Sequence, residues 1–229
     1  GRGLDMDMAE AIRNRKSIRG FKPDPVPREI LEQILDLARR APSTMNTQPW
    51  EFVVLTGEVL QKITQENVRK LSGGVMIHPE HVITGWPGNS VFRARQVEVA
   101  RRIFDLMGIL REDKEKRAAW MERGFCYFDA PVAVIILTDR ALTEAGPLMD
   151  IGAVMQTICL AALEHGLGTC IEDQGVMYPE TIRQAANIPE SKRIVISIAI
   201  GYPDKEFPAN RLESPREPLD KIVSWHGFE

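Results

Sequence analysis

Residues 41–56, APSTMNTQPWEFVVLT, end one predicted helix and begin one predicted strand. The run before them carries apolar residues at helical spacing, and Pro42 stops it. After Pro49, the segment WEFVVLT is apolar, rich in β-branched residues and closed by Gly57, which predicts a buried strand. The polar residues between the two prolines therefore form a loop that is fixed at both ends.

This loop carries more hydroxyl and amide groups than a simple connection needs. Its polar side chains are Ser43, Thr44, Asn46 and Gln48. Such donors and acceptors could hold a polyhydroxylated chain or the edge of a heterocycle. Serine, threonine and asparagine in turns also commonly bond their own backbone, so a purely structural turn is the alternative interpretation.

Outward from this loop, apolar periodicity predicts a chain of alternating helices and strands. The predicted helices cover residues 7–15, 28–41, 58–71, 93–107, 111–125, 150–168 and 179–188, and the further strands cover 132–138, 169–172 and 193–203. The six apolar residues from Val132 to Leu137 indicate a central strand. The helix beginning at Asp150 is apolar around nearly its whole circumference, so we expect protein on every side of it.

The composition is that of one globular domain covering residues 1–229. The chain has 229 residues, of which 44% are hydrophobic and 27% charged, enough to bury a substantial core. Its formal net charge of −3 argues against a general nucleic-acid binder, which needs a dominant basic face. No segment has the uninterrupted apolar length of a membrane span, and the first residues lack the plan of a signal peptide.

The three cysteines, Cys126, Cys159 and Cys170, form no C-x-x-C pair. Two of them lie in strongly apolar stretches, which is typical of reduced core residues in a cytoplasmic protein. His78 and His81 stand in a Gly/Pro-rich loop without an evident third ligand, so no metal site is expected.

Two segments depart from regular periodicity. Residues 72–89 are rich in Gly and Pro, which predicts a long loop acting as a lid or substrate element, with Trp86 as a possible roof over the substrate. Residues 204–229 have little core pattern but contain several apolar side chains. A C-terminal arm lying on a partner subunit would explain these side chains, and so would packing on its own domain.

A basic run near the N-terminus is a candidate anion site. Its cations are Arg13, Arg15, Lys16, Arg19 and Lys22, and no acidic residue lies among them. Guanidinium groups suit phosphate oxygens, and a cation beside a redox-active ring stabilises negative charge that develops there. A solvated basic surface is the alternative.

Two further stretches could contribute to a ligand site. The segment LGTCIEDQG follows the apolar helix and ends a strand, where backbone N–H groups can address a ring nitrogen. Arg211 and Arg216 in the tail could close over a phosphate, although surface arginines usually do not. The sequence patterns of a Rossmann dinucleotide site, a P-loop and an α/β-hydrolase are absent.

Taken together, these stretches resemble the FMN-dependent nitroreductase family. RKSIRGF resembles the family's R-x-S-x-[RK]-x-F start, APSTMNTQPWEFVVL its A-P-S-x-x-N-x-Q-P-W strand entry, AALEHGLGTC its buried helix and strand, and REPLDKIV its R-x-P-L-x-x-[IV] tail. The four motifs occur in order over nearly the whole chain. The spacing and the segment FDAPVAVIILTDR look most like the nitroarene and nitrobenzoate reductase branch.

The resemblance implies an α+β fold with three layers. A mostly antiparallel mixed sheet would be flanked by helices, and two chains would interlock as a homodimer with FMN in the interface. Arg15, Lys16 and Ser17 would hold the phosphate end and the ribityl chain, and Arg19 would lie near the pyrimidine edge of the flavin.

The remaining site residues are also carried over from the resemblance. Those reaching the same flavin from the other subunit would be Pro42, Ser43, Thr44 and Asn46. Ile171 and Glu172 would bring backbone groups to flavin N5, with Asp173 beside them where relatives commonly have glycine. Arg216 would complete the phosphate clamp, with Arg211 as a second candidate.

The implied activity is an NAD(P)H-dependent reduction of electron-poor aromatic compounds such as nitroarenes, with ping-pong transfer of hydride through FMN. No catalytic side chain is expected, because the flavin carries the chemistry and solvent can supply protons. The alternatives are the same fold acting on quinones, enones or halogenated phenols, a flavin-binding protein without significant turnover, and a basic-patch protein without flavin.

Overall fold

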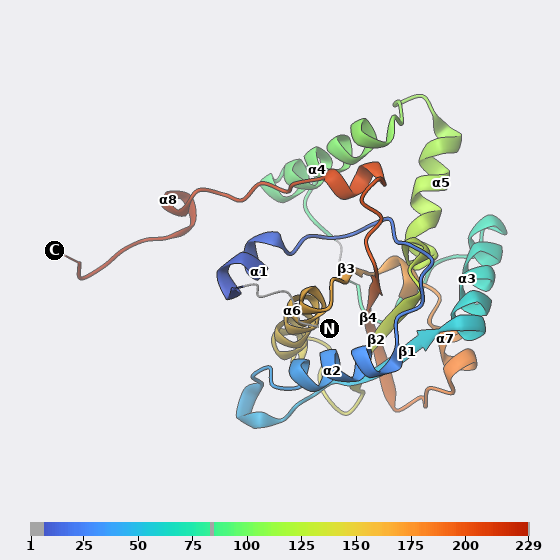
Figure 1. The fold of residues 1–229 in the computed structure, drawn as a ribbon, viewed down its shortest axis with the longest axis horizontal. Helices are drawn as coiled ribbons and strands as arrows, with labels where there is room; N and C mark the ends of the chain where they lie inside the picture. The colour runs from blue at the N-terminus through green and yellow to red at the C-terminus, as the bar shows by residue number, and fades with distance from the viewer. Residues whose placement is uncertain (1–6, 83–84, 229) are drawn as a thin grey trace.

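The computed structural model describes residues 7–82 and 85–228, and its centre is a four-stranded sheet (Figure 1). The strands are β1 (Glu51–Thr56), β2 (Val132–Asp139), β3 (Gly168–Glu172) and β4 (Lys192–Gly201), in the order β1-β2-β4-β3. All three pairs of neighbours are antiparallel. The two inner strands, β2 and β4, are the long apolar runs of the sequence, which confirms the prediction of a central strand at Val132.

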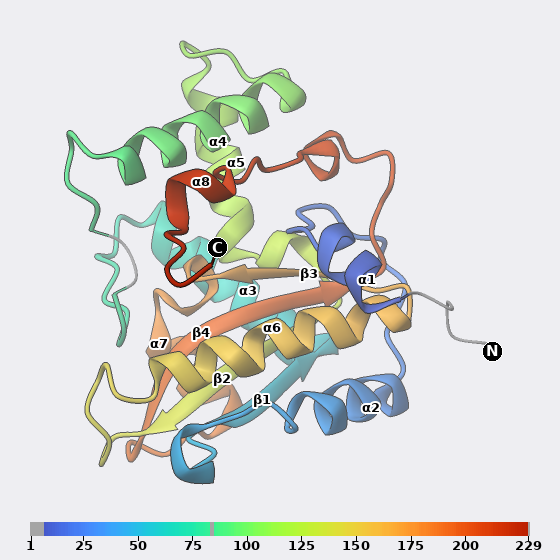
Figure 2. The same cartoon turned by 90° about the vertical axis from the view of Figure 1, so that its left-hand side faces the viewer.

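Helices cover both faces of the sheet. They are α1 (Met8–Asn14), α2 (Arg28–Ala38), α3 (Gly57–Ser72), α4 (Val91–Met107), α5 (Lys114–Phe125), α6 (Leu148–Glu164), α7 (Pro179–Ala186) and α8 (Leu219–Ile222). Figure 2 shows α6 crossing one face, with α2 beside it, while α3 lies behind the sheet. Two separate apolar clusters fill the spaces on the two sides. The three-layer α+β prediction is therefore confirmed.

Among the described residues, one short contact adds a parallel pairing to the sheet. Ser17 forms a parallel bridge with Thr169 at the outer edge of β3, and the Ile18 N–H donates to the Thr169 carbonyl at 2.9 Å. The part of the chain that the structure describes also contains four short 3₁₀ turns: η1 (Thr44–Asn46), η2 (Tyr127–Asp129), η3 (Gln174–Val176) and η4 (Pro208–Arg211). No helix in the described ranges is both long enough and apolar enough to span a bilayer.

Helix α6 is enclosed only in part by its own chain, so the prediction of protein on every side of it would need a second chain to be met in full. Ile151, Val154 and Ile158 are buried against the sheet and α2. On another face Met149 is 87% exposed, and Gln156 is also exposed. Part of the apolar surface of α6 thus remains open in the single chain.

The loop after α3 is anchored to the core over its first half. Glu80 accepts hydrogen bonds from the Arg183 guanidinium at 2.7 and 2.8 Å and from the Ile194 N–H at 2.7 Å. The Tyr178 hydroxyl donates to the Val75 carbonyl at 2.8 Å. This half is therefore tied to the folded domain, although residues 72–78 are exposed, and residues 85–89, which include Trp86, form a further exposed segment that could act as a lid.

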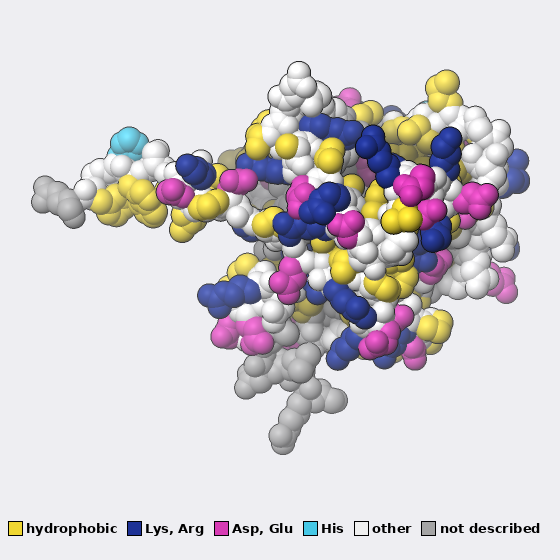
Figure 3. Space-filling view, turned by 90° about the horizontal axis from the view of Figure 1, so that it is seen from above, with side chains coloured by type: hydrophobic (Ala, Val, Ile, Leu, Met, Phe, Trp, Pro, Cys, Tyr) yellow, Lys and Arg dark blue, Asp and Glu magenta, His cyan; other side chains and the backbone are white. Residues whose placement is uncertain are grey.

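The C-terminal arm has two parts with different packing. Ala209 and Leu212 are buried against Ile103 of α4, so the first part packs on its own domain. The second part, residues 218–228, projects away from the body, and Figure 3 shows its apolar side chains in the open. Packing on its own domain thus accounts for the first part of the arm, and contact with a partner subunit stays a prediction for the second part.

Candidate functional site

The basic run lies along the open edge of β3. After α1 ends at Asn14, the chain pairs with β3 at Ser17 and continues past Arg19. Burial raises the pKa of the Cys170 thiol to about 12, and the nearby positive charge of Arg19 opposes part of this rise. The structure therefore brings three of the predicted phosphate and flavin residues, Arg15, Lys16 and Ser17, together with Arg19 beside β3.

The cations of this run lack acidic partners. Within the described parts of the chain, no carboxylate lies within 4.0 Å of a side-chain nitrogen of Arg13, Arg15, Lys16, Arg19 or Lys22. Elsewhere on the same chain many arginines are paired, for example Arg101 with Glu98 and Asp105. Several uncompensated positive charges beside a strand edge favour binding of an anion at this place.

The outer edge of β3 offers backbone groups to a ligand. Because the Thr169 carbonyl faces outward to Ile18, the alternation of an antiparallel strand turns the backbone groups of Ile171 toward the same edge. The Glu172 carbonyl instead accepts from the Ser197 hydroxyl at 2.8 Å, on the β4 side. Ile171 is thus the strand residue whose backbone is best placed for a ligand, and Asp173 follows at the start of η3.

The carboxyl group of Glu172 points into the protein. It accepts hydrogen bonds from the Gly175 N–H at 2.8 Å and from the Ser197 hydroxyl. Burial raises the pKa of Glu172 to about 8, although these hydrogen bonds oppose the rise. The side chain therefore holds the turn after β3 in place and does not reach the open edge.

The polar loop of residues 42–48 is held by its own groups and by α6. The Ser43 hydroxyl accepts from the Gln48 N–H at 3.0 Å, and the Gln48 amide donates to the Asn46 carbonyl at 3.1 Å. The Thr44 N–H points to the buried Asp150 carboxylate, 3.2 Å from Oδ1. Ser43 and Gln48 thus follow the structural interpretation of this turn, whereas the exposed side chains of Thr44 and Asn46 have no hydrogen-bond partner within the described ranges.

One chain does not bring the polar loop and the basic run together. The loop is tied to Asp150 at the start of α6, whereas the charge of Arg15 acts on Cys159 farther along the same helix. At about 1.5 Å per residue, Asp150 and Cys159 are roughly 14 Å apart along the helix axis. The two predicted walls of the site therefore lie at different positions along α6.

The two tail arginines lie in different surroundings. Arg211 is exposed and follows Asn210, whose side chain bonds the backbone of Arg19. The guanidinium of Arg216 donates to the carbonyls of Ser214 and Pro215, both at 3.0 Å. Arg216 borders a cavity of about 400 Å³ beside α4, so it is not positioned over the basic run in this chain.

Three residues that hold the candidate site in place were not predicted from the sequence. Asp150 anchors the polar loop, while Asn210 and Arg123 bond the backbone of Arg19 from sequence distances of 191 and 104 residues. Each is a single polar residue in an ordinary helix or turn, so no local pattern marks it.

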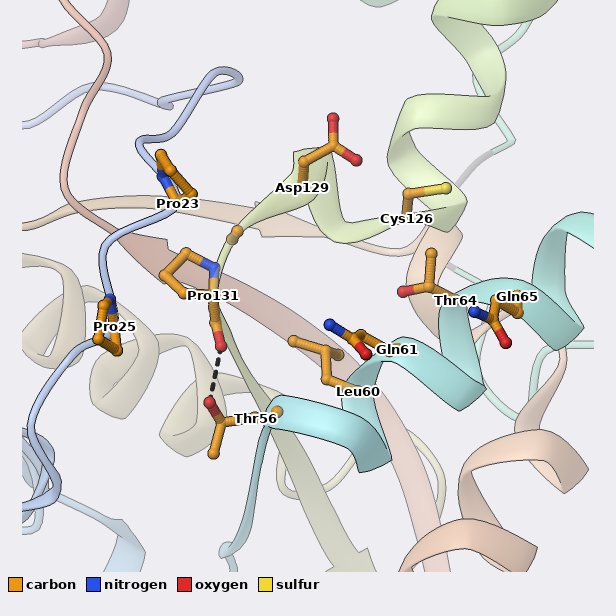
Figure 4. Close-up of a pocket in the computed structure, with 12 residues that line it drawn as sticks. Pro23, Pro25, Thr56, Leu60, Gln61, Thr64, Gln65, Cys126, Asp129 and Pro131 are labelled. Atoms are coloured by element: carbon orange, nitrogen blue, oxygen red, sulfur yellow. Dashed lines mark hydrogen bonds between the residues drawn. The ribbon is translucent and has the colours of Figure 1, made fainter.

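A second cavity, of about 420 Å³, contains none of the predicted site residues. Figure 4 shows its wall of prolines facing the first turns of α3. The Thr56 hydroxyl donates to the Pro131 carbonyl at 2.9 Å on the rim of this cavity.

The described residues contain no group of three or more His, Cys, Asp or Glu that could hold a metal ion, and His78 instead contacts Glu180.

A family model described as the Nitroreductase family matches residues 12–202. The match covers the basic run, the polar loop and the end of β3, and it stops before Arg211 and Arg216. The chain therefore belongs to the Nitroreductase family.

Named relatives and solved structures cover nearly the whole chain. The chloronitrobenzene nitroreductase of Comamonas testosteroni is 32% identical over 94% of this chain and 95% of its own length. The 4-nitrobenzoate reductase of Pseudomonas putida is 31% identical over 99% of this chain and 98% of its own length. The crystal structure of the FMN and NADPH-dependent nitroreductase NfnB from sphigopyxis sp. strain HMH has a TM-score of 0.92 and 32% identity, over 97% of this chain and 100% of that chain.

Proposed function

We propose that this chain is an FMN-dependent oxidoreductase that uses NAD(P)H to reduce electron-poor aromatic compounds such as nitroarenes. The observation that carries the proposal is the basic run from Arg15 to Arg19, which lies along the open edge of β3 and has no ion pair to a carboxylate of the described residues. Membership of the Nitroreductase family supports it, and so do relatives named for nitrobenzene and nitrobenzoate reduction.

The residues at this edge fit the chemistry of FMN. A phosphate monoester needs cations and hydroxyl donors, which Arg15, Lys16 and Ser17 would supply. The pyrimidine edge of a flavin needs hydrogen-bond partners and a positive charge, which the open backbone of Ile171 and the side chain of Arg19 would supply. Because the carboxylate of Glu172 is turned inward, no negative charge from that side chain opposes the ligand.

FMN held at this edge would supply the hydride-transfer chemistry that links NAD(P)H to the second substrate. The protein's own residues would hold the ring and leave one face accessible. Arg19 would stabilise negative charge that develops on the pyrimidine part of the ring, and the open backbone of Ile171, with Asp173 after it, would offer hydrogen-bonding groups to the flavin, whereas the Glu172 carbonyl is bonded to Ser197 on the β4 side. No side chain is required as a general acid or base, since water can protonate the reduced acceptor.

The second wall of the site is proposed to come from another copy of the chain. Pro42, Ser43, Thr44 and Asn46 lie too far along α6 to reach the basic run of their own chain, so a homodimer would bring the partner's loop to it. The exposed face of α6 at Met149 supports such an interface.

The arm supports the same assembly. Four apolar side chains of residues 218–228 are exposed by 64% to 76%: Leu219, Ile222, Trp225 and Phe228. Apolar side chains gathered on a projecting arm are expected to bury against a partner. In the dimer, Arg216 and Arg211 would complete the phosphate clamp, and Trp86 of the exposed loop would border the substrate.

The surroundings of the protein are also a proposal. The three cysteines carry no disulfide, and two of them are buried, which supports a reducing, cytoplasmic location. Neither nucleic acid nor a membrane is proposed as a partner.

Steady-state kinetics would test the proposed activity. With NADPH and a nitroarene varied together, we expect the parallel double-reciprocal lines of a ping-pong reaction. A panel of quinones, enones and halogenated phenols under the same conditions serves as the comparison. Turnover of those compounds without turnover of any nitroarene would reassign the acceptor, and no turnover with either group would leave a flavin-binding role.

A further inference from the structure

The main chain of Arg19 is held by two side chains from distant parts of the sequence. Asn210, in η4 of the C-terminal arm, is 6% exposed, and its Oδ1 accepts the Arg19 N–H at 2.7 Å and the Gly20 N–H at 3.2 Å. Its Nδ2 donates to the Gly20 carbonyl at 2.7 Å and to the Asp204 carbonyl at 2.8 Å. All four hydrogen-bonding positions of this amide are therefore in use.

Arg123, at the end of α5, holds the other side of the same residue. Its Nη2 donates to the Arg19 carbonyl at 2.9 Å, and its Nη1 pairs with Asp129 at 2.7 Å. The guanidinium also lies over the Phe207 ring, 4.7 Å from the centroid. Both backbone groups of Arg19 are thus bonded, the N–H by the arm and the carbonyl by α5.

Close packing restricts this segment further. A Cβ at Gly20 would lie 2.1 Å from Cγ of Phe207, so the ring rests directly on the glycine backbone. Ile18, on the other side of Arg19, is buried and bonded to β3. In contrast, Arg19 is half-buried, and its side chain makes no hydrogen bond or ion pair within the described ranges. A rigid main chain here carries a cation that is free to act on a ligand.

We propose that Asn210 and Arg123 are positioning residues that fix the backbone of Arg19 so that its guanidinium tunes the bound flavin. This inference rests on the proposed function. It gives the packed first part of the arm a role in the redox chemistry, because Asn210 lies in η4 within that part, directly before Arg211. The arm packs on α4 through Ala209 and Leu212, and the amide of Asn210 would link this packed part to the placement of the tuning cation.

A double-mutant cycle tests the proposal. The variants are Asn210→Leu, Arg19→Ala and the double variant, each loaded with FMN, with the midpoint potential of the flavin measured anaerobically against reference dyes. We expect Asn210→Leu to make the potential more negative and to slow flavin reduction by NADPH severalfold, because the reduced anionic ring loses a well-placed cation. In the Arg19→Ala background the same substitution should change neither quantity, since its effect passes through Arg19.

Asn67→Leu is the matched control. Asn67 is also a buried asparagine, and its amide donates to the Phe125 carbonyl at 3.1 Å, but it does not bond Arg19. This variant should change stability and leave the potential unchanged. Should Asn210→Leu fail to fold, Arg123→Leu and Arg123→Lys replace it, and the lysine, which can still donate to the Arg19 carbonyl, should restore part of the shift.

Two results would overturn the proposal: a wild-type potential and reduction rate in Asn210→Leu, or an equal shift in the presence and absence of the Arg19 side chain. Failure of the proposed function looks different, because the wild-type protein itself would then bind no FMN, and the positioning role would fall with it.

Discussion

The backbone N–H of Thr44 lies 3.2 Å from Oδ1 of Asp150, so the polar loop is tied to the first turn of α6. The carboxylate is 9% exposed and lies at the positive end of the helix dipole, which stabilises its charge. This contact fixes the position of the loop proposed to reach a flavin in the partner subunit.

Asp150→Ala should release this loop. Removing the acceptor leaves the Thr44 N–H without its partner, and we expect a loss of about 1 to 2 kcal/mol in the free energy of unfolding. Affinity for FMN should fall as well, because Thr44 and Asn46 lose their fixed position. Asp36→Ala, at an exposed carboxylate paired with Arg39, is the control for a change of charge alone. Unchanged FMN affinity in Asp150→Ala would argue against a flavin-binding role for the loop.

Arg15→Ala and Lys16→Ala should weaken FMN more than riboflavin. Loss of one charge-assisted hydrogen bond to phosphate is expected to raise the Kd for FMN about ten- to a hundredfold, whereas riboflavin lacks that group. Flavin fluorescence titration measures both affinities. Arg13→Ala removes a cation of the same run that is not assigned to the site and should have little effect. Equal losses for the two flavins would place the phosphate elsewhere.

Glu172 should make stability depend on pH. Its pKa is raised from 4.5 to about 8 by burial, so the folded state keeps a proton that the unfolded state releases between these values. Stability conferred by the neutral carboxyl group is therefore complete below about pH 4.5 and is lost as the pH rises toward 8. Glu172→Gln, which stays neutral, should flatten this decline in urea unfolding experiments from pH 5 to 8. The same slope in both proteins would assign the decline to other groups.

The anchored half of the loop after α3 should contribute to global stability. Glu80→Ala leaves Arg183, whose side chain is 9% exposed, without its carboxylate, and we expect a loss of about 3 kcal/mol in the free energy of unfolding. Arg28 and Glu32 form an exposed pair, so Glu32→Ala should cost less than about 1 kcal/mol. Similar losses in the two variants, measured by urea unfolding, would show that the Glu80 contacts are not retained in solution.

Removal of residues 218–229 should weaken the proposed dimer. This arm segment exposes Trp225 and Phe228, which we expect to bury against the partner. Sedimentation velocity should show dissociation at concentrations where the full chain is dimeric, together with loss of FMN. Leu142→Ala, at an exposed apolar residue outside the arm and α6, should remain dimeric. A truncated chain that stays dimeric would leave the arm without a role in assembly.

The elements of the fold could be predicted because their local signals agree. The continuous apolar runs of β2 and β4 indicate inner strands, and Gly108, with φ of 63°, ends α4 at the predicted position. The composition of α6 predicts protein on every side of the helix, but an apolar helix does not reveal whether its last face is covered by its own chain or by another. Met149 marks the uncovered face.

The site could be predicted only in part. Motifs located the basic run and the end of β3, and the structure places the run beside this strand through the bridge of Ser17 to Thr169 near the strand's start. The residues that hold the backbone of the site in place could not be found from motifs. Asn210 and Arg123 act through hydrogen bonds to the backbone of Arg19, and such contacts leave no pattern near either residue in the sequence.

The central claim is that this chain binds FMN and cycles it between NAD(P)H and a nitroarene. Anaerobic titration of the purified protein with NADPH, followed through the flavin absorbance, tests it most directly. We expect one equivalent of NADPH to bleach one bound flavin, and addition of a nitroarene to restore the oxidised spectrum without oxygen. A protein that binds no added FMN, or whose bound flavin stays oxidised with both NADPH and NADH, would contradict the claim.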